Sequence, residues 1–517
     1  MPRCPSRNWQ NRGHRVQVNL ASVSLRSQYC AGYGMAGLCA FDNYFTSQYI
    51  DANWIIQMPP TQATAKFAGA FFTDQPDELA GQVKTFVSQG VAGRQLPMDR
   101  PRAIISPHAG YRFSGAVAGR AFGAAAMFQY DQIVILSPSH RHGFDGLALP
   151  EWSEMQLPNG VARVAHDTCQ ALLARGLAHV EQAAHANEHG VETQLPFVVQ
   201  FFKSTPIVPL VVGRMAAEKL AAVVDYLDHH GQGNTLFVIS SDLSHFLTDQ
   251  TACALDLETA GFIEQADWGN IKSQNACGWG PLSGVLASGF GGGLRTLRLD
   301  MANSSRVTND SDRVVGYGAW AMYPPQSQVF NDKQRGELLR VARGAAKSYL
   351  RRNAHATLNV GSFGPALQSH MASFVTLTHK GRLRGCIGSL QAHQPLVQDV
   401  AQNVVKSAVN DRRFTPLTHP DQMDELDIKI AVLTRPHRVK FNSKDELLAA
   451  MMPHVSGMIV QDQGHRGTFL PMVWDSLPTP EQFWNGLLVK AGLPKGHWSD
   501  TIKVWHFYAE SFADPPR

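Results

Sequence analysis

Three short runs of valine, isoleucine and leucine each stop at a polar group that can carry chemistry. His108 follows the first run, His140 follows the second, and Asp242 with His245 follows the third. Continuous apolar runs that alternate with helical patterns are typical of strands in a mostly parallel sheet covered on both faces. Ligands of such sheets bind beyond the carboxyl ends of the strands. The sequence therefore predicts an α/β sandwich in which these side chains converge on one site, and we expect that site to hold a metal ion.

Composition limits the classes of protein to which the chain can belong. Its 517 residues exceed one ordinary core, and 44% hydrophobic with 17% charged residues are typical of globular domains rather than disorder. A net charge of +4 is too small to indicate nucleic acid as a partner. The seven cysteines include no Cys-x-x-Cys pair, and no apolar run approaches the roughly 20 residues that span a bilayer. We expect a cytoplasmic protein without a membrane segment or a disulfide framework.

The chain divides into four predicted segments. Residues 1–58 are rich in arginine, contain no acidic residue before Asp42, and predict a disordered extension, with a transit peptide as the alternative. Residues 59–325 alternate strand and helix patterns, as an α/β domain does. Two prolines at the end of that domain are followed by a polar linker at residues 326–331. Residues 332–517 begin with an amphipathic helix and continue with hairpins and helices that are segregated along the chain, which indicates an α+β domain.

The strand-end residues each have a plainer alternative. His108 and His140 are the leading metal-ligand candidates because a neutral imidazole binds Zn, Fe or Cu, although a single strand-end histidine is more often structural. Asp242 and His245 suit an acid and a base beside a bound substrate. Asp242 suits equally well the N-cap of a helix that begins at Leu243.

Four further residues complete the predicted site. Cys277 stands in a glycine-rich loop, where its thiolate would complete a His/His/Cys metal site, but such a cysteine is also often inert and buried. His189 and Glu192 offer another imidazole and another acid, with a helix start as the simpler explanation. Tyr111, which follows His108 in the same motif, is a further pocket candidate.

These motifs resemble the Memo family over residues 59–323. In chain order, the matching motifs are His108-Ala109-Gly110-Tyr111, Pro138-Ser139-His140, His189-Gly190-Val191-Glu192, Ser241-Asp242-Leu243-Ser244-His245 and Cys277-Gly278. Memo proteins are similar to class III extradiol dioxygenases, whose non-haem iron is held by two histidines and a glutamate. The resemblance implies that His108 and His140 are metal ligands and that Cys277 replaces the glutamate. It also implies that His245 is the acid/base and Asp242 an adjacent pocket residue. Because a thiolate changes metal preference and redox potential, the cysteine weakens the expectation of ring cleavage.

The second half resembles the AMMECR domain over residues 331–512. The motifs are Leu383-Arg384-Gly385-Cys386-Ile387-Gly388, Gly467-Thr468-Phe469-Leu470-Pro471-Met472-Val473-Trp474 and Lys490-Ala491-Gly492-Leu493-Pro494. Alternation along a strand puts Arg384 and Cys386 on one face, while Gly385 and Gly388 permit close approach of another backbone. The pattern suits a cysteine nucleophile or an anion site. It suits equally a glycine-containing strand with a partly buried thiol.

Together the two resemblances imply a fusion of components B and A of the system called AmmeMemoRadiSam. Its third member is a radical S-adenosylmethionine enzyme, and because the chain has no Cys-x-x-x-Cys-x-x-Cys motif we expect that enzyme to be a separate partner. We expect one metal ion, Fe(II) first, with Cu or Zn as alternatives. The leading hypothesis is a metal-dependent, dioxygenase-like oxidoreductase that performs or supports an oxidative or radical-linked modification. A non-catalytic metal-binding adaptor that docks a protein or peptide is the main alternative, and a hydrolase using zinc-bound water is the third.

Overall fold

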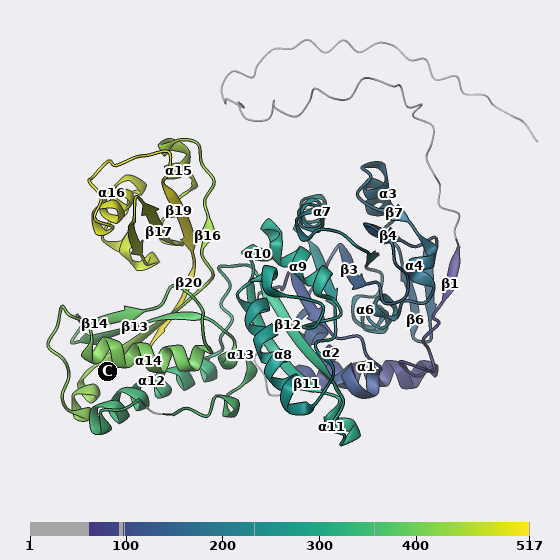
Figure 1. Cartoon of the computed structure of the whole chain (residues 1–517), viewed down its shortest axis with the longest axis horizontal. Helices are drawn as coiled ribbons and strands as arrows, with labels where there is room; N and C mark the ends of the chain where they lie inside the picture. Colours follow the sequence, from purple (N-terminus) through teal and green to yellow (C-terminus); the bar gives the residue numbers. More distant parts are fainter. Residues whose placement is uncertain (1–60, 92–96, 98, 232, 356, 516–517) are drawn as a thin grey trace, which may run out of the picture. The chain divides into compact units, whose positions relative to one another are not determined.

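The computed structural model describes residues 61–91, 97, 99–231, 233–355 and 357–515 (Figure 1). These residues belong to one compact unit, Met58–Arg517, and a separate unit, Met1–Gln57, precedes it in the chain. The predicted extension at residues 1–58 lies outside the described residues. In the described part, no helix is both long and apolar enough to cross a membrane.

The N-terminal half, residues 61–323, is built on a nine-stranded sheet. Its strands are β2 (Ala103–Ser106), β3 (Gln132–Pro138), β4 (Leu147–Leu149), β7 (His179–Val180), β8 (Ile207–Val212), β9 (Thr235–Ser240), β10 (His245–Leu247), β11 (Arg295–Asn303) and β12 (Val314–Tyr323). The order is β10-β12-β2-β9-β3-β8-β4-β7, with β11 on the other side of β12. The four central strands β2, β9, β3 and β8 are parallel, but β12 and β4 run antiparallel to their inner neighbours. The α/β class is confirmed, and the sheet is mixed rather than mostly parallel.

Helices cover both faces of this sheet. They are α1 (Pro76–Val91), α2 (Tyr111–Ala125), α3 (His166–Ala174), α4 (Gln182–Ala186), α5 (His189–Glu192), α6 (Leu195–Phe202), α7 (Ala217–His230), α8 (Asp249–Glu264), α9 (Trp279–Ala287), α10 (Gly289–Gly293) and α11 (Ser305–Thr308). Alternate residues of β3 point to opposite faces, as a strand requires. Ile133 and Ile135 pack with residues of α1, α2 and α6, whereas Val134 and Leu136 pack with residues of α7 and α9. A strand buried on both faces explains why its sequence is apolar without alternation.

Two smaller elements complete the N-terminal half. A three-stranded sheet contains β1 (Gln62–Thr64), β5 (Glu154–Leu157) and β6 (Gly160–Arg163). A 3₁₀ turn, η1 (Trp268–Asn270), lies between α8 and α9.

The C-terminal half, residues 332–515, contains two antiparallel sheets of four strands. The first has the order β14-β13-β15-β20, made of β14 (Arg382–Gly388), β13 (Ala372–His379), β15 (Asp427–Leu433) and β20 (Ala509–Ala513). The second has the order β16-β19-β17-β18, made of β16 (His437–Arg438), β19 (Lys503–Phe507), β17 (Gly457–Asp462) and β18 (His465–Phe469). Ala372, Leu433, Ile459 and Phe507 form an apolar cluster that joins the two sheets.

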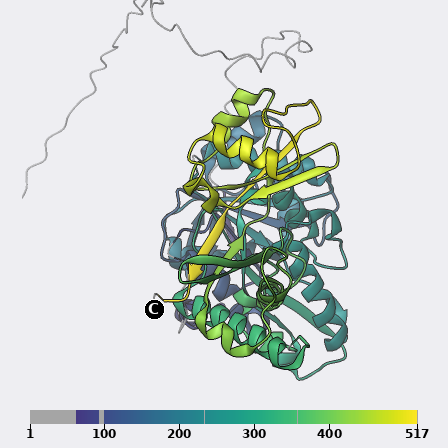
Figure 2. The same ribbon diagram turned by 90° about the vertical axis from the view of Figure 1, so that its left-hand side faces the viewer.

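Helices of the C-terminal half pack on these sheets. They are α12 (Asp332–Arg352), α13 (Pro365–Gln368), α14 (Leu396–Val409), α15 (Lys444–Ala450) and α16 (Pro480–Lys490), with 3₁₀ turns η2 (Val360–Ser362), η3 (Pro420–Glu425) and η4 (Pro471–Asp475). α12 and α14 lie together on the first sheet, as Figures 1 and 2 show. Their apolar residues share a core with Val375 of β13 and Ile430 of β15, so the helical spacing predicted for α12 corresponds to a buried face.

Buried carboxylates fix the chain on either side of the boundary between the halves. Glu510 of β20 accepts hydrogen bonds from the backbone amides of Val329 (2.8 Å) and Phe330 (3.2 Å), which lie in the segment predicted as a linker. Glu264, at the end of α8, accepts from the Arg298 guanidinium at 2.6 and 2.9 Å and from the backbone amide of His370 at 2.7 Å. Glu510 thus binds the connecting segment to β20, and Glu264 binds the N-terminal half to the backbone of the C-terminal half at His370.

Candidate metal centre

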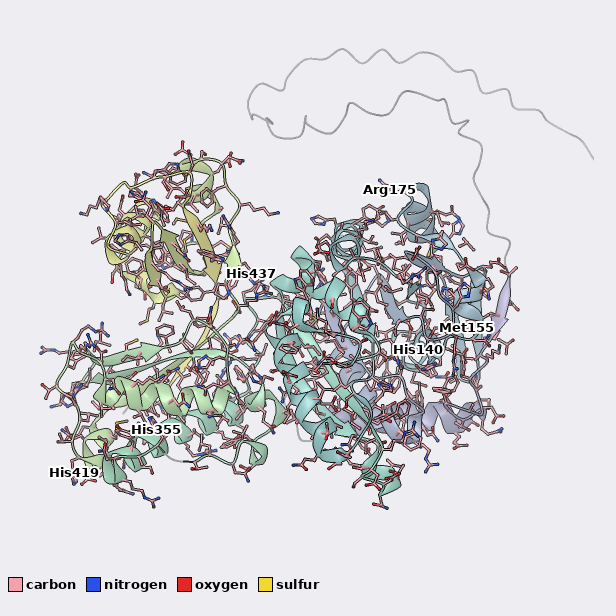
Figure 3. The ribbon with its side chains drawn as sticks, in the orientation of Figure 1. His140, Met155, Arg175, His355, His419 and His437 are labelled. Atoms are coloured by element: carbon pink, nitrogen blue, oxygen red, sulfur yellow. The ribbon has the colours of Figure 1, made fainter. Side chains whose placement is uncertain are left out.

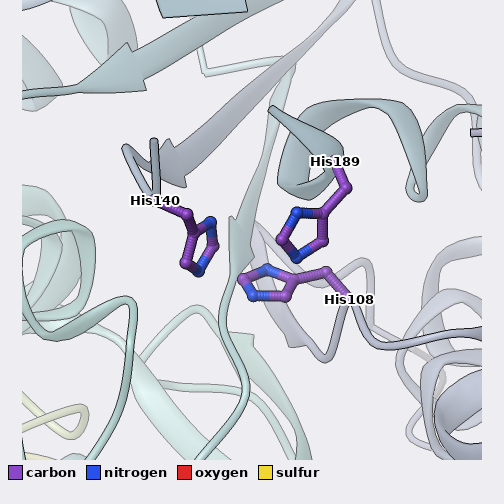
Figure 4. Close-up of side chains that lie close together, drawn as sticks. All are labelled: His108, His140 and His189. Carbon is purple, nitrogen blue, oxygen red and sulfur yellow. The ribbon is translucent and has the colours of Figure 1, made fainter. Parts of the chain in front are cut away.

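Neighbouring strand ends bring the predicted site together. β2, β9 and β3 are adjacent and parallel, and His108, Asp242 and His140 each stand two residues beyond the end of one of them. His189, the first residue of α5, joins this group from the helical connection between β7 and β8. One ligand nitrogen from each of His108, His140 and His189 lies within 4.8 Å of the others. Figure 3 locates His140 in the molecule, and Figure 4 shows the three rings turned toward one another.

The hydrogen bond at Nδ1 of His108 determines which of its two nitrogens can act as a ligand. The Ser240 hydroxyl donates to the Gly190 carbonyl at 2.6 Å, so the serine oxygen accepts the bond that joins it to His108 Nδ1 at 2.8 Å. His108 Nδ1 therefore carries the proton, and Nε2 has an available lone pair. Burial, helped by the nearby His140, lowers the pKa of His108 from 6.5 to about 3. This imidazole is neutral at physiological pH.

His140 is oriented in the same way by a carboxylate. Its Nδ1 lies 2.8 Å from Glu188 Oε1, and its backbone amide donates to Glu188 Oε2 at 2.8 Å. Burial acts to raise the pKa of Glu188, but the hydrogen bonds from His140 outweigh it and leave that pKa below its ordinary value. An ionised carboxylate on Nδ1–H fixes the tautomer and leaves Nε2 as the donor for a metal, the outer-shell arrangement common to metal-binding histidines.

His189 faces these two rings from the start of a helix. Glu188 is the N-cap of α5, because its side chain accepts the amide of Gly190 at 2.9 Å, so the helix start predicted from the sequence is present. The His189 ring packs on Phe71, with ring centres 4.7 Å apart. Burial and the neighbouring His108 lower the pKa of His189 to about 4. A third imidazole, with a lowered pKa, therefore borders the site.

Cys277 lies against His108 rather than at the centre of the three rings. Its Sγ is 3.1 Å from His108 Nε2 and accepts the backbone amide of Asp242 at 3.3 Å. A Cβ on Gly278 would come within 2.5 Å of Ser241, so only glycine allows the cysteine loop to approach the end of β9 this closely. Burial, with a contribution from the Asp242 carboxylate, raises the pKa of the Cys277 thiol.

Asp242 supports the loop that carries His108. Its Oδ1 accepts the backbone amide of His108 at 2.8 Å, and burial raises its pKa. The helix that Asp242 would cap is absent, since the chain from Ser241 to Ser244 is irregular and β10 begins at His245. This rules out the N-cap alternative.

His245 and Tyr317 both interact electrostatically with Asp242. His245 is half-buried at the start of β10 and interacts electrostatically with both Asp242 and His108. Tyr317 of β12 is buried, and burial together with the Asp242 carboxylate raises its pKa. The sequence prediction missed Tyr317, because a tyrosine inside a glycine-rich strand has no local mark of a site.

Tyr111 and Glu192 have structural partners. The Tyr111 hydroxyl donates to the Thr193 carbonyl at 2.7 Å, and its ring packs against Phe72 and Phe197. Glu192 accepts the backbone amides at positions 66 and 67, at 3.0 and 2.6 Å. These contacts hold α5 and the start of the described chain around the histidines.

The prediction assigned no orienting role to the residues that hold the imidazoles. Glu188, Ser240 and Gln194 are buried, and Gln194 Nε2 donates to the Ser240 hydroxyl at 3.0 Å. Glu188 directly precedes His189, and Ser240 directly precedes Ser241-Asp242 in the chain. Their positions next to two motifs were the available signal, but their partners are distant in sequence.

The arrangement suits a borderline or soft metal ion. Imidazole nitrogen and thiolate sulfur bind Zn, Fe and Cu, whereas Mg and Ca prefer oxygen. Burial lowers the pKa of His108 and of His189, and His108 and His140 each have an outer partner on Nδ1. His108 and His189 can therefore bind a metal ion without first losing a proton.

Comparison with known families agrees with this geometry. The family model for Memo-like protein matches residues 63–321, which is half of the chain, and the model for AMMECR1 matches residues 339–512. The chain belongs to the Memo family. It is a fusion of a Memo-like domain with an AMMECR1 domain, as the motifs predicted.

Curated relatives match the Memo-like domain. A MEMO1 family protein of Thermotoga neapolitana is 30% identical over 272 residues, covering 48% of this chain and 95% of its own length. Another, of Methanothermobacter thermautotrophicus, is 28% identical over 267 residues, covering 48% of this chain and 96% of its own. Among solved structures, an uncharacterized protein of Pyrococcus horikoshii is 31% identical with a TM-score of 0.34, covering 36% of this chain and 93% of its own. That TM-score is too low to bear on the fold.

Proposed function

We propose that this Memo–AMMECR1 fusion binds one redox-capable metal ion and performs or supports an oxidative or radical-linked modification of a substrate. The observation that carries the proposal is the pairing of His108 with His140. Each has an outer partner on Nδ1, Ser240 for one and Glu188 for the other, and one ligand nitrogen of each lies within 4.8 Å of that of the other. Structural histidines need no such matched orientation of two rings.

Cys277 is our choice for the third ligand. Its Sγ lies 3.1 Å from His108 Nε2, and by the family resemblance it would stand where a dioxygenase has its glutamate. His189 competes for that role, since its nitrogen lies within 4.8 Å of those of His108 and His140. Variants of the two residues separate a His/His/Cys centre from a His/His/His centre.

Fe(II) is the metal we expect first, with Cu and Zn as alternatives. A bound redox-capable ion would supply oxygen activation or polarisation of a substrate oxygen. The protein would supply His245 as the group that moves a proton, because it is half-buried beside the ligands. Asp242 would hold the His108 loop in place through the 2.8 Å bond to its amide.

A separate radical S-adenosylmethionine enzyme is the partner that the resemblance implies for this fusion. Joining the Memo-like and AMMECR1 domains in one chain keeps both at high effective concentration when they serve one substrate or one complex.

A specific observation favours the adaptor function as the second candidate. Phe246 and Trp279, adjacent in sequence to His245 and Cys277-Gly278, are 61% and 44% exposed, and a docked protein or peptide would cover them.

Metal analysis of the protein purified without oxygen tests the proposal. Near-stoichiometric iron or copper, with a spectrum that changes on oxidation, supports a redox centre. A protein that stays metal-free after loading with Fe(II), Cu(I), Cu(II) and Zn(II) contradicts it and leaves the adaptor function. Stoichiometric zinc alone, with no redox response, supports a hydrolytic centre instead.

A further inference from the structure

Three motifs of the AMMECR1 domain that are distant in sequence meet at one place. Cys386 lies on the edge strand β14, Phe469 ends β18 and Lys490 ends α16. The Lys490 ammonium is 5.1 Å from the centre of the Phe469 ring and interacts electrostatically with Cys386 and Arg413. The two sheets of the domain thus contribute to one cluster, which we call the Cys386 cluster: Arg384, Cys386, Arg413, Phe414, Phe469 and Lys490.

The thiol of this cluster is held in a fixed position. Thr376 of the neighbouring strand β13 donates its hydroxyl to Cys386 Sγ at 3.2 Å. The Cys386 amide donates to Asp411 Oδ2 at 2.9 Å, and Arg413 binds the same carboxylate at 2.7 and 2.9 Å. The hydrogen bonds from Arg413 hold the pKa of Asp411 below its ordinary range. The strand and the 411–413 loop therefore form one hydrogen-bonded support around a half-buried sulfur.

Positive charge exceeds negative charge around this sulfur. Asp411 balances one guanidinium, that of Arg413. Arg384 donates to the Thr415 carbonyl and lies over the Phe414 ring, 5.8 Å from its centre, so a neutral acceptor and a ring hold it. Among the described residues Lys490 has no carboxylate partner. Two cations are therefore left to attract an anion toward Cys386.

Close packing requires glycine at two positions of the Leu383–Gly388 motif, but it does not require the polar groups of the Cys386 cluster. A Cβ on Gly385 would lie 2.1 Å from the Ser407 carbonyl of α14, and one on Gly388 would lie 2.3 Å from Phe374. Both glycines are needed to seat β14 against its neighbours. No such requirement applies to the thiol of Cys386 or the ammonium of Lys490, which are not in the core.

We propose that the Cys386 cluster is a second ligand site, which binds a small carboxylate- or phosphate-bearing molecule and presents the Cys386 thiolate to an electrophilic carbon of that ligand. The site is independent of the proposed metal centre. In the reaction, the thiol releases its proton to the solvent, the electron pair of the resulting thiolate forms an S–C bond, and the leaving group departs with the electron pair of the bond that breaks. With iodoacetate as a probe, the product is carboxymethyl-Cys386 and iodide.

Comparing iodoacetate with iodoacetamide tests the site on the full chain. The two reagents share their leaving group and differ in charge, so their rate ratio at each cysteine reports the local preference for an anion. Cys253 is the internal control, because it is exposed and its Sγ lies 3.8 Å from the Asp249 carboxylate. Residue-resolved mass spectrometry at one pH measures the iodoacetate-to-iodoacetamide rate ratio at each cysteine. This ratio should be at least about threefold higher at Cys386 than at Cys253, because one unit charge attracts another across about 6 Å of water by enough to change a rate by that factor. Equal ratios at the two cysteines overturn the proposal.

Lys490→Gln should lower the ratio at Cys386 toward that at Cys253. Lys503→Gln, at an exposed position of β19, is the matched control and should leave both ratios unchanged. An unchanged ratio in Lys490→Gln, with unaltered thermal unfolding, contradicts the proposal. Arg413 is not varied, since its loss would release the carboxylate that holds the Cys386 amide.

Protection of Cys386 against iodoacetamide by added anions identifies the class of anion that the cluster binds. Inorganic phosphate and acetate are tested separately for slowing iodoacetamide at Cys386. Slowing by phosphate supports a phosphate-bearing ligand, and slowing by acetate alone supports a carboxylate. Slowing by neither, or equal slowing at Cys253, overturns the binding site.

Discussion

The two halves of the molecule each place a cysteine beside a glycine, and the surroundings give the two thiols opposite properties. Cys277 is held among imidazoles and a carboxylate, accepts the Asp242 amide, and has a pKa raised by burial. Cys386 is half-buried on an edge strand and interacts with Arg413 and Lys490. A cysteine between neutral nitrogen donors suits a cation, which displaces the thiol proton. A cysteine between cations suits an anionic ligand.

The glycines of the two sites have the same physical role. Gly278 lets the Cys277 loop reach Ser241, and Gly385 lets β14 reach Ser407. In each case the glycine has no side chain, so the backbone next to the cysteine can pack against another element. The motif residues that look alike in sequence therefore position the thiols, while residues from elsewhere in the chain decide their chemistry.

The largest expected effect is that of His140→Ala on metal content. The change removes one of the two best-oriented nitrogens, so stoichiometric metal binding should be lost while the fold is kept, because the His140 side chain is 23% exposed. Cys386→Ser should retain full metal content. Elemental analysis of both variants, with circular dichroism to check folding, measures the difference. Equal metal content in the two variants would contradict the proposal that His140 binds the metal ion and Cys386 does not.

Cys277→Ser and His189→Ala sharpen the assignment of the third ligand. Loss of a direct ligand should weaken metal affinity by more than the roughly 10–100-fold that loss of an outer partner costs. We expect the larger loss in Cys277→Ser, together with a change in the absorption spectrum of the metal-loaded protein. Competition titration with a chelator gives the affinities. A larger loss in His189→Ala would assign a His/His/His centre and leave Cys277 as a neighbour of His108.

Glu188→Gln tests the outer partner of His140. The amide keeps the shape of the carboxylate but removes its charge, so His140 loses the group that fixes its tautomer. Metal affinity should fall about 10–100-fold while stoichiometry at saturating metal stays the same. Glu181→Gln is the control, because Glu181 is half-exposed and its carboxylate is 3.6 Å from His142. Comparable affinities in the two variants would exclude an orienting role for Glu188.

The sequence predicted the centre of the fold better than its edges. A run such as Ile133-Val134-Ile135-Leu136 shows burial on both faces, and the strand that carries it is indeed central and parallel. The antiparallel pairing of β12 and β4 was missed, because the side-chain pattern of a strand does not depend on the direction of its neighbour. Strand direction comes from the path of the connections, which apolar patterning does not encode.

The site was predictable where it depended on strand ends. His108 and His140 follow strands directly, so local patterning was sufficient to bring them together. Glu188 is 48 residues from His140 along the chain, and Lys490 ends α16, a helix that packs on β17 and β18 rather than on the sheet that contains Cys386. Contacts of that kind depend on the tertiary fold, and they supply the hydrogen bonds and charges that separate one cysteine from the other.

The smallest expected effect separates burial of a histidine from metal binding. His437 in the C-terminal half has a pKa lowered to about 4 by burial and by the nearby His506, but its Nε2 has no hydrogen-bond partner among the described residues. A folded-state pKa below the unfolded value of 6.5 means that the unfolded chain binds more protons between those values, so this contribution to stability is complete above pH 6.5 and is lost as pH falls toward 4. His437→Gln should therefore reduce the loss of unfolding free energy between pH 7 and pH 5 by about 1–2 kcal/mol.

His419→Gln, at an exposed position, is the control and should leave that loss unchanged. Denaturant titrations of both variants at both pH values measure the difference. If His437→Gln instead lowered the metal content, the C-terminal half would hold a metal as well, and the division of roles between the two halves would fail.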